Sequence, residues 1–193
     1  DHEASSDAGA DNVYDVVVSV SDGARTDTQT IAVTVTAVND NTPTITSGST
    51  FSVAENTIAV TTVTASDADL PGQTLTYSIA GCADAARFTI DSATGVLQFV
   101  AAPDHEASSD AGADNVYDVV VQVSDGAQTD TQAIAVTVTA ANDNAPAITS
   151  GSVFSVAENT ATVTTVTASD ADLPGQTLSF SIAGGADAAR FAI

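Results

Sequence analysis

Acidic and amide side chains that could bind a metal ion recur along this chain at a fixed interval. Ala-Val-Asn-Asp-Asn-Thr-Pro occupies residues 37–43, and Ala-Ala-Asn-Asp-Asn-Ala-Pro occupies residues 140–146, which begins 103 positions later. Carboxylate, amide and backbone carbonyl oxygens are the ligands that hard divalent cations prefer. With one cysteine and two histidines, the chain offers no thiolate or imidazole cluster that would favour zinc or copper. The pattern predicts a site for calcium, which fits irregular oxygen cages better than magnesium does.

The same interval relates long parts of the sequence. Residues 1–90 align without a gap with residues 104–193, and 77 of the 90 positions are identical. A period of 103 residues is too long for a solenoid unit and suits a domain with its own core. The predicted order is the C-terminal part of repeat 1 (1–38), a calcium linker (39–43), the complete repeat 2 (44–141), a second calcium linker (142–146) and the N-terminal part of repeat 3 (147–193).

The composition limits the partners that the chain can have. Asp and Glu number 25 against 3 arginines, and the formal net charge is −22, so nucleic acid and anionic lipid would be repelled. Hydrophobic residues make up 44% of the chain, enough for sizeable cores, but no apolar run approaches the roughly 20 residues of a membrane helix. We therefore expect neither nucleic-acid binding nor membrane insertion.

Each repeat is predicted to be all-β. Apolar and polar residues alternate in residues 14–20 and 31–35, which is the two-residue period of a half-buried strand. Further strand candidates, separated by turn sequences, are residues 51–55, 59–65, 74–80, 87–90 and 95–100. About seven strands in roughly 100 residues are the proportions of an immunoglobulin-like Greek-key β-sandwich.

Strand ends in such a sandwich alternate between two poles, so acidic residues that follow strands should gather where successive repeats meet. At the second junction the gathered carboxylates would be those of Glu55, Asp104, Glu106, Asp143, Asp170 and Asp172. Neighbouring carboxylates about 5–6 Å apart repel by roughly 3 kcal/mol at an effective dielectric constant near 20. The repeats must therefore splay apart or hold cations between them, and about three calcium ions would come close to neutralising the group.

The motifs, in this order, resemble those of the cadherin repeat. Asn-Asp-Asn, Ala-Glu-Asn, Asp-Ala-Asp, Phe-Thr-Ile-Asp-Ser-Ala-Thr-Gly-Val-Leu, Pro-Asp-His-Glu and Ser-Asp-Gly are spread over essentially the whole chain. The resemblance implies a cadherin-like sandwich with calcium at each junction. At the second junction it implies side-chain ligands from Glu55, Asp104, Glu106, Asp143, Asp170 and Asp172. At the first junction it implies Asp1, Glu3, Asp40, Asp67, Asp69 and Asp125. It also implies that Asn39 and Asn142 coordinate through the side-chain carbonyl, and Asn41 and Asn144 through the backbone.

Two features depart from the family pattern. Ala37 and Ala140 stand where the family usually has an aspartate two places before the first linker asparagine, which implies one ligand fewer and a weaker central ion. His2 and His105 replace the arginine of the usual Asp-Arg-Glu, and one histidine per junction makes a poor metal site. Four other acidic residues are expected to be ordinary solvated surface, namely Asp7, Asp11, Asp110 and Asp114.

The function that these features imply is mechanical. Calcium would lock successive repeats into a stiff rod, so we expect a secreted, cell-surface module that forms the stalk of an adhesin or an extracellular fibre. Near-identical repeats and extreme acidity are similar to those of the long secreted repeat adhesins of bacteria. The partners would be neighbouring repeats of the same chain.

Two other classes of function use the same residue types. A calcium-dependent carbohydrate- or self-binding module, with the ion as part of the ligand site, is the alternative. An enzyme is not expected. A carboxylate pair could act in a glycosidase, but the chain has no tryptophan to stack sugars and an entire active site would be duplicated.

The two ends of the sequence raise a separate possibility. Residues 1–38 are the final strands of a repeat and residues 147–193 the opening ones, so together they lack only the counterpart of residues 91–103. Sheet edges associate unless something covers them. Either the sequence is a window on a longer rod, or the C-terminal part of one molecule completes the N-terminal part of another, head to tail.

Overall fold

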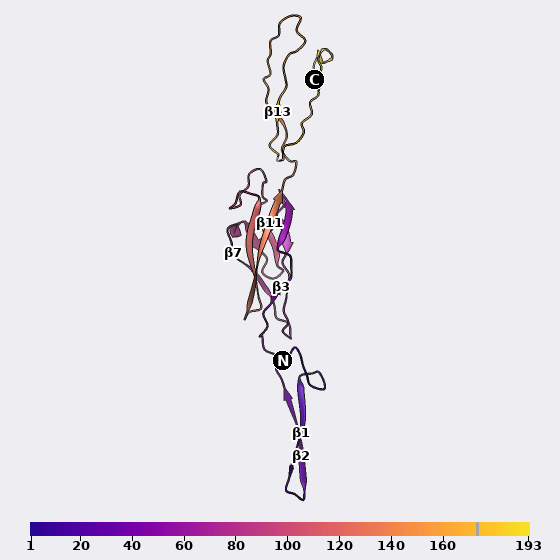
Figure 1. The fold of residues 1–193 in the computed structure, drawn as a ribbon, viewed down its shortest axis with the longest axis vertical. Helices are drawn as coiled ribbons and strands as arrows, with labels where there is room; N and C mark the ends of the chain where they lie inside the picture. Colours follow the sequence, from indigo (N-terminus) through magenta and orange to yellow (C-terminus); the bar gives the residue numbers. More distant parts are fainter. Residues whose placement is uncertain (173) are drawn as a thin grey trace.

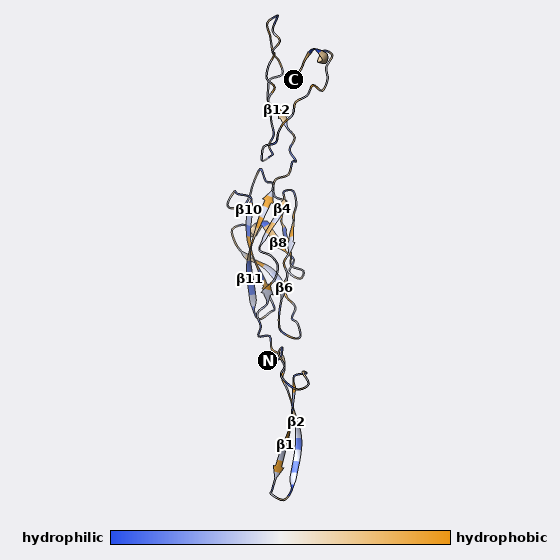
Figure 2. Ribbon diagram, turned by 45° about the vertical axis from the view of Figure 1, so that its right-hand side comes forward, coloured by the Kyte–Doolittle hydropathy of each residue, from blue (hydrophilic) through white to orange (hydrophobic). Residues whose placement is uncertain are grey.

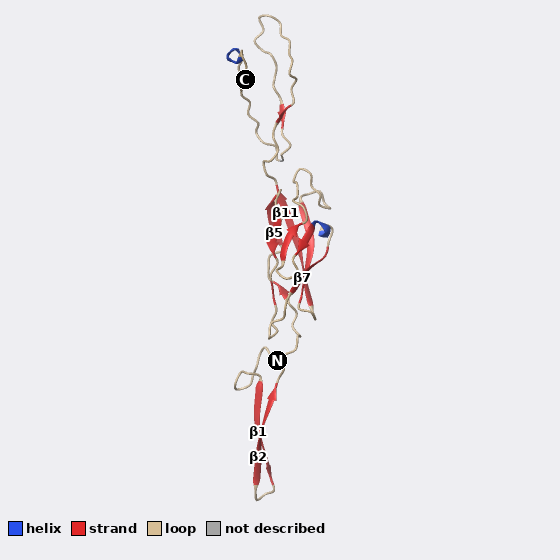
Figure 3. Ribbon diagram, turned by 180° about the vertical axis from the view of Figure 1, so that it is seen from behind, coloured by secondary structure: helices blue, strands red, loops and turns tan. Residues whose placement is uncertain are grey.

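The computed structural model describes residues 1–172 and 174–193. Three parts follow one another along the long axis of the molecule: an N-terminal hairpin, a central domain and a C-terminal part (Figure 1). The helical structure in the described residues consists of two short 3₁₀ turns, η1 (Ala85–Arg87) and η2 (Ala188–Arg190) (Figure 3). No helix among them is long and apolar enough to cross a membrane. The prediction of an all-β chain is confirmed.

The central domain is a sandwich of two main sheets. One sheet has four strands in the order β4 (Thr50–Ala54), β11 (Thr129–Thr139), β10 (Val116–Ser124) and β7 (Thr76–Gly81). The other has three strands in the order β5 (Ala59–Thr62), β9 (Val96–Phe99) and β8 (Phe88–Ile90). A short pair, β3 (Thr44–Ile45) and β6 (Ala65–Ser66), lies beside them. β4 runs parallel to β11 and the other pairs are antiparallel, in agreement with the predicted immunoglobulin-like sandwich.

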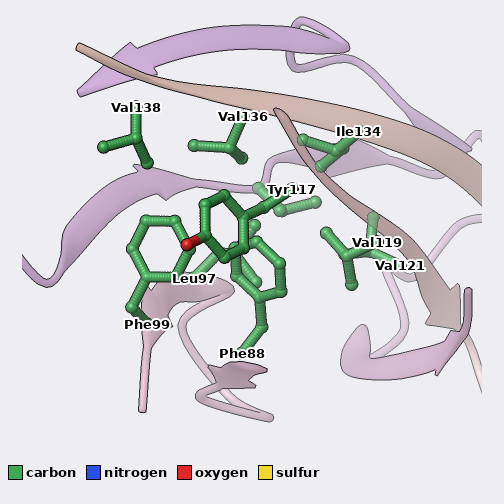
Figure 4. Packing of buried hydrophobic residues seen from close by; sticks show 10 residues of the cluster. Phe88, Leu97, Phe99, Tyr117, Val119, Val121, Ile134, Val136 and Val138 are labelled. Carbon is green, nitrogen blue, oxygen red and sulfur yellow. The ribbon is translucent and has the colours of Figure 1, made fainter. Parts of the chain in front are cut away.

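Alternate residues of β10 and β11 build the core between the two sheets. These residues, each at most 1% exposed, are Tyr117, Val119, Val121, Val123, Ile134, Val136 and Val138. Opposite them, the rings of Phe88 and Phe99 stack with their centroids 4.7 Å apart, and Tyr117 meets Phe99 edge-on at 5.1 Å (Figure 4). Fully burying one such side chain contributes about 1.5–3 kcal/mol, so this cluster holds the sheets face to face.

The N-terminal hairpin repeats β10–β11 in sequence and in register. β1 (Val13–Ser21) pairs with β2 (Thr26–Thr34), and Val18 lies opposite Gln29 just as Val121 lies opposite Gln132. Val18 is nevertheless 44% exposed, whereas Val121 is fully buried. The reason is that no second sheet packs on this hairpin within the described residues. Figure 2 shows orange, apolar residues in the hairpin as well as in the central domain.

The C-terminal part contains one short ladder. β12 (Ala147–Ile148) pairs with β13 (Ala168–Ser169), as β3 pairs with β6 in the central domain. Residues 153–157 and 179–184, the counterparts of β4 and β7, have no strand assignment. In the central domain the corresponding strands β4 and β7 pair with β11 and β10.

Candidate metal centres at the repeat junctions

Carboxylates from three segments meet at the first junction, between the hairpin and the central domain. Glu3, Asp40 and Asp69 each offer one oxygen atom, and these atoms lie within 4.8 Å of one another. Glu3 precedes β1, Asp40 lies between β2 and β3, and Asp69 follows β6. The group therefore combines one carboxylate from each side of the linker with one from the linker itself.

A second group lies at the same junction, within the central domain. Oxygens of Asp67, Asp69 and Asp125 also lie within 4.8 Å of one another, so Asp69 belongs to both groups. Asp69 is 1% exposed and Asp125 is 7% exposed. Asp67 and Asp69 follow β6, and Asp125 follows β10. The sandwich topology brings these strand ends to the same pole.

Linker amides fix the carboxylates of the first junction. Asn41 donates to Asp69 Oδ1 from its backbone N–H at 3.2 Å and from Nδ2 at 2.6 Å. The backbone N–H of Gln128 donates to Asp125 Oδ1 at 2.6 Å and lowers the pKa of this aspartate. With its nitrogen turned toward them, the Asn39 amide donates to Asp125 at 3.1 Å and to Asp69 at 3.3 Å. The opposite orientation would point the Asn39 oxygen at the same carboxylates, as a cation ligand.

The second junction has a matching group on the side of the central domain. Oxygens of Glu55, Glu106 and Asp143 lie within 4.8 Å of one another. Glu55 directly follows β4, Glu106 lies between β9 and β10, and Asp143 lies between β11 and β12. As at the first junction, the linker and an adjoining repeat both contribute.

Glu55 is the most constrained member of this group. Its side chain is 3% exposed. Oε1 accepts a hydrogen bond from the backbone N–H of Ala141 at 2.6 Å, and Oε2 accepts one from His105 at 2.8 Å. These bonds, with that from Ala141 the stronger, lower the pKa of Glu55, because they stabilise the ionised form. A buried anion is therefore held at the pole where Asp143 enters.

On the far side of the second linker, Asp172 is 1% exposed. Asn144 donates to Asp172 Oδ1 from its side chain at 2.9 Å and from its backbone at 3.0 Å, and its side-chain bond is the main cause of the lowered pKa of Asp172. Asn142 donates to Gln176 Oε1 at 2.8 Å, and Gln176 donates to Asp172 Oδ2 at 3.1 Å. Gln176 is a contact that sequence reasoning missed, because no motif marks it.

Three predicted ligands take part in local turns instead of a described carboxylate group. Asp1 Oδ1 accepts the N–H of Glu3 at 3.2 Å, Asp104 Oδ1 accepts that of Glu106 at 3.0 Å, and Asp170 Oδ1 accepts that of Asp172 at 3.1 Å. Each bond spans two residues and orients the following acidic residue. These aspartates are not members of the described groups, and their role as calcium ligands stays a prediction.

The residues present fit a calcium ion. All donors are carboxylate or amide oxygens, which calcium prefers. Oδ2 of Asp67 is buried and has no hydrogen-bond partner in the described structure, as expected of an oxygen whose partner is a cation. Among the described residues, the arginine ion pair is that of Arg190 with Asp187, so no arginine neutralises Glu55 or Asp69.

The acidic loop of residues 107–115 corrects one expectation. Asp110, predicted to be ordinary solvated surface, is only 7% exposed. It accepts hydrogen bonds from the Ser108 hydroxyl and from the backbone N–H groups of Asp114 and Asn115, the latter two at 3.1 Å. Burial acts to raise the pKa of Asp110, but the hydrogen bonds outweigh it and lower the pKa to about 2. The sequence signal was Asn115, which adopts a positive φ of 62° as this loop closes.

Asp84 is a second buried carboxylate that sequence reasoning missed. It is 4% exposed, accepts the N–H of Ala111 at 2.7 Å on Oδ1 and accepts the N–H of Asp118 at 3.0 Å on Oδ2. It therefore ties the residue before η1 to the acidic loop and to β10. These partners are 27 and 34 residues away, so no local pattern indicates the contact.

Fold and junctions together resemble those of cadherin repeats. A family model described as "Cadherin domain" matches residues 49–140, which covers most of the central domain. Cadherin domains generally bind calcium, and the acidic groups described above lie at both ends of the matched region. The cadherin-like adhesion fold is typically non-enzymatic.

Solved structures of cadherin repeats are similar to this chain. Protocadherin Gamma B2 extracellular cadherin domains 3–6 match with 26% identity and a TM-score of 0.64, covering 89% of this chain and 44% of that one. The protocadherin gammaB7 EC3–6 cis-dimer structure matches with 26% identity and a TM-score of 0.61, covering 83% and 43%. Human CDH23 EC21–23 shares the fold at 22% identity and a TM-score of 0.63, covering 83% and 55%.

This chain thus spans less than half the length of the protocadherin fragments that it matches. No curated protein sequence shows a significant match. The boundaries of the three repeats and two linkers remain predictions.

Proposed function

We propose that this chain is an extracellular structural and adhesion module whose tandem repeats are stiffened by calcium at their junctions. It would form the stalk of a surface adhesin or part of an extracellular fibre. The observation that carries the proposal is the grouping of carboxylates around each linker. Glu3, Asp40 and Asp69 meet at one junction, and Glu55, Glu106 and Asp143 meet at the other.

The residues of the chain hold the two sides of a junction in position for this role. Glu55, fixed by the backbone of Ala141 and His105, presents an anion at the end of the central domain. Asn144 links Asp143 in the linker to Asp172 on the far side, by bonds of 2.9 Å to each. When bound, calcium would supply the positive charge that makes close approach of these carboxylates favourable. The junction would then resist bending.

The energetic effect is expected to be modest for each ion and large for the array. Extracellular calcium modules have Kd values of about 10⁻⁴ to 10⁻³ M. Calcium at about 10–100 times Kd would stabilise each site by roughly 1.4–2.7 kcal/mol. Because Ala37 and Ala140 offer no carboxylate, we expect the calcium affinity to lie toward the weak end of this range.

Near-identical repeats, high acidity and the lack of an intrachain disulfide favour a secreted bacterial adhesin as the parent molecule.

Calorimetric titration of the chain with calcium tests the proposal. We expect uptake near millimolar calcium, with binding at the second junction lost in Asp143→Asn. Asp118→Asn is the matched control, since it removes one charge from an exposed position of the central domain outside both junctions. Absence of calcium uptake by the unmodified chain, or equal losses in both variants, would refute the proposed function.

A further inference from the structure

The three-stranded sheet of the central domain carries an open polar hollow of about 530 Å³. β8, β9 and the turn that joins them form its walls, and its lining includes Thr89, Asp91, Ser92, Val96 and Gln98. No member of the carboxylate groups at the two junctions lines it. The hollow therefore belongs to the central domain itself and is separate from the candidate metal centres.

The alternation of residues along β8 and β9 places the polar side chains on the outer face of the sheet. Phe88, Leu97 and Phe99 are at most 5% exposed and point into the core (Figure 4). Successive side chains of a strand point to opposite faces, so Thr89 and Gln98 lie on the outer face. They are direct partners across the two strands, with Cβ atoms about 4.5–5.5 Å apart. Both side chains can thus contact the same small ligand.

Asp91 contributes a fixed anion to the hollow. Its Oδ1 atom accepts hydrogen bonds from the backbone N–H of Thr94 at 2.8 Å, the Thr94 hydroxyl at 2.8 Å and the backbone N–H of Ala93 at 3.0 Å. These bonds lower the pKa of Asp91, with that from the Thr94 backbone the strongest, because they stabilise the ionised form. Oδ2 accepts no hydrogen bond from any residue that the structure describes, so this oxygen is available to a ligand.

The other polar groups of the hollow are unused as well. The hydroxyls of Thr89 and Ser92 and the half-buried amide of Gln98 have no hydrogen-bond partner among residues 1–172 and 174–193. Ala192 stands 103 positions after Thr89, so the Thr89 hydroxyl is not a constant feature of the repeat. The hollow therefore combines donors and acceptors that the fold itself does not use.

The turn between β8 and β9 is held in place before any ligand arrives. The N–H of Val63 donates to the carbonyl oxygen of Gly95 at 2.8 Å, and the N–H of Tyr77 donates to that of Ser92 at 2.9 Å. Gly95 is buried against Val63, with no room for a Cβ. A site that is already ordered loses less conformational entropy on binding.

We infer that this hollow binds a neutral sugar. Neighbouring hydroxyls of one ring would donate to Asp91 Oδ2 and exchange hydrogen bonds with the Gln98 amide and the Thr89 hydroxyl, since amides and hydroxyls both donate and accept. The C–H face of the ring would lie on Val96, which is 41% exposed. A few convergent polar groups beside an apolar surface are the usual arrangement of a small-molecule site.

The charges of the hollow select among ligands. An acidic ligand would be repelled by Asp91 and by the net charge of −22. A basic peptide is disfavoured because Asp91 is the one charged residue in the lining. Arg87, exposed just before β8, also makes no ion pair in the described part of the chain, so its positive charge opposes a cation. A neutral polyol suits these groups best.

Nuclear magnetic resonance of the ¹⁵N-labelled chain in EDTA tests the inference. The probes are the methyl glycosides of glucose, galactose, mannose and N-acetylglucosamine, each titrated separately. At least one should shift the amide signals of residues 89–98, including the side-chain amide of Gln98, and leave the junction residues unchanged. Residues 91–98 have no copy elsewhere in the chain, so their signals are unique. Because calcium is absent, this result is independent of the calcium titration that tests the proposed function.

Matched variants connect the shifts to the hollow. Asp91→Asn should weaken sugar binding about tenfold or more, and Thr89→Ala about twofold to tenfold. Their controls are Asp118→Asn and Thr137→Ala, at exposed positions of the four-stranded sheet, which should bind as the unmodified chain does. Thr89→Ala introduces the residue found at position 192, so a loss of binding with an otherwise unchanged spectrum excludes misfolding.

Three results would overturn the inference. The first is the absence of shifts at residues 89–98 with every glycoside. The second is equal binding by Asp91→Asn, Thr89→Ala and their controls. The third is a response of these signals to a trilysine peptide and to none of the sugars, which would assign the hollow to a cationic partner.

Discussion

Replacing Asp143 with asparagine should stabilise the calcium-free chain and destabilise the calcium-bound one. Asp143 has an oxygen within 4.8 Å of oxygens of both Glu55 and Glu106. At that distance each pair of full charges repels by about 0.9 kcal/mol in bulk water and by about 3.5 kcal/mol at an effective dielectric constant of 20. Because Asp143 is exposed, the lower figure applies, and two pairs give about 1.7 kcal/mol.

The substitution also removes one hydrogen bond at an exposed site. Asp143 accepts from Asn56 at 2.5 Å and from Asn144 at 2.9 Å, and asparagine can accept only one of these with the same geometry, at a cost of about 0.5–1 kcal/mol. The net expectation is about 1 kcal/mol of stabilisation without calcium, or roughly 4–8 °C in Tm for a domain of this size. With saturating calcium the loss of a charged ligand should reverse the sign, by about 1.4 kcal/mol for each tenfold loss of affinity.

Thermal unfolding at low salt, in EDTA and in calcium, measures both effects. Asp118→Asn should change Tm little in either buffer, since surface substitutions stay within about 0.5 kcal/mol. In 1 M NaCl, where the Debye length is about 3 Å, the calcium-free gain of Asp143→Asn should vanish. A variant that is less stable than the unmodified chain in EDTA at low salt would refute the reasoning that crowded anions strain this junction.

Three further predictions test the central domain. Gly95 has a φ of 71°, and a Cβ there would lie 2.2 Å from the carbonyl oxygen of Val63. Gly95→Ala should therefore lower the free energy of unfolding by at least about 2 kcal/mol in urea titrations. An unchanged midpoint would contradict this. Leu97→Ala should cost about 2–5 kcal/mol by the same assay, against under about 1 kcal/mol for Val96→Ala at a position that is 41% exposed. The pKa of Asp110 is lowered from 3.8 to about 2 in the folded state. Its contribution to stability is therefore present above pH 3.8 and is lost as the pH falls through about 2. Asp110→Asn should flatten the dependence of Tm on pH in that window, and an unchanged slope would count against the buried carboxylate.

The strands could be predicted because burial follows the alternation of residue types. Residues 14–20 lie in β1 and residues 31–34 lie in β2, with residue 35 just after it, and their counterparts form the central core. The sequence could not show that Val18 would be exposed while Val121 is buried. That difference depends on whether a second sheet covers the hairpin, which no local period records.

The carboxylate groups could be anticipated because their members follow strands whose ends alternate between two poles. Asp67, Asp69 and Asp125 meet in this way. The burial of Asp84 could not be anticipated, because it depends on backbone N–H groups 27 and 34 residues away. The burial of Asp110 depends on closure of its own loop, for which Asn115 is the local signal. Acidic loops with Gly and Asn are usually solvated turns, and only the folded loop distinguishes a surface aspartate from one that organises it.

The most direct test of calcium stiffening is the distance across the first junction. Cys82 is the one cysteine of the chain and is exposed, so a spin label there can be paired with a label on Thr28→Cys in β2, diluted with unlabelled chain to remove contacts between copies. Pulsed electron resonance should give a narrow distance distribution in calcium and a broad one in EDTA, with Asp40→Asn broad in both. Equal widths with and without calcium in the unmodified junction would contradict the account.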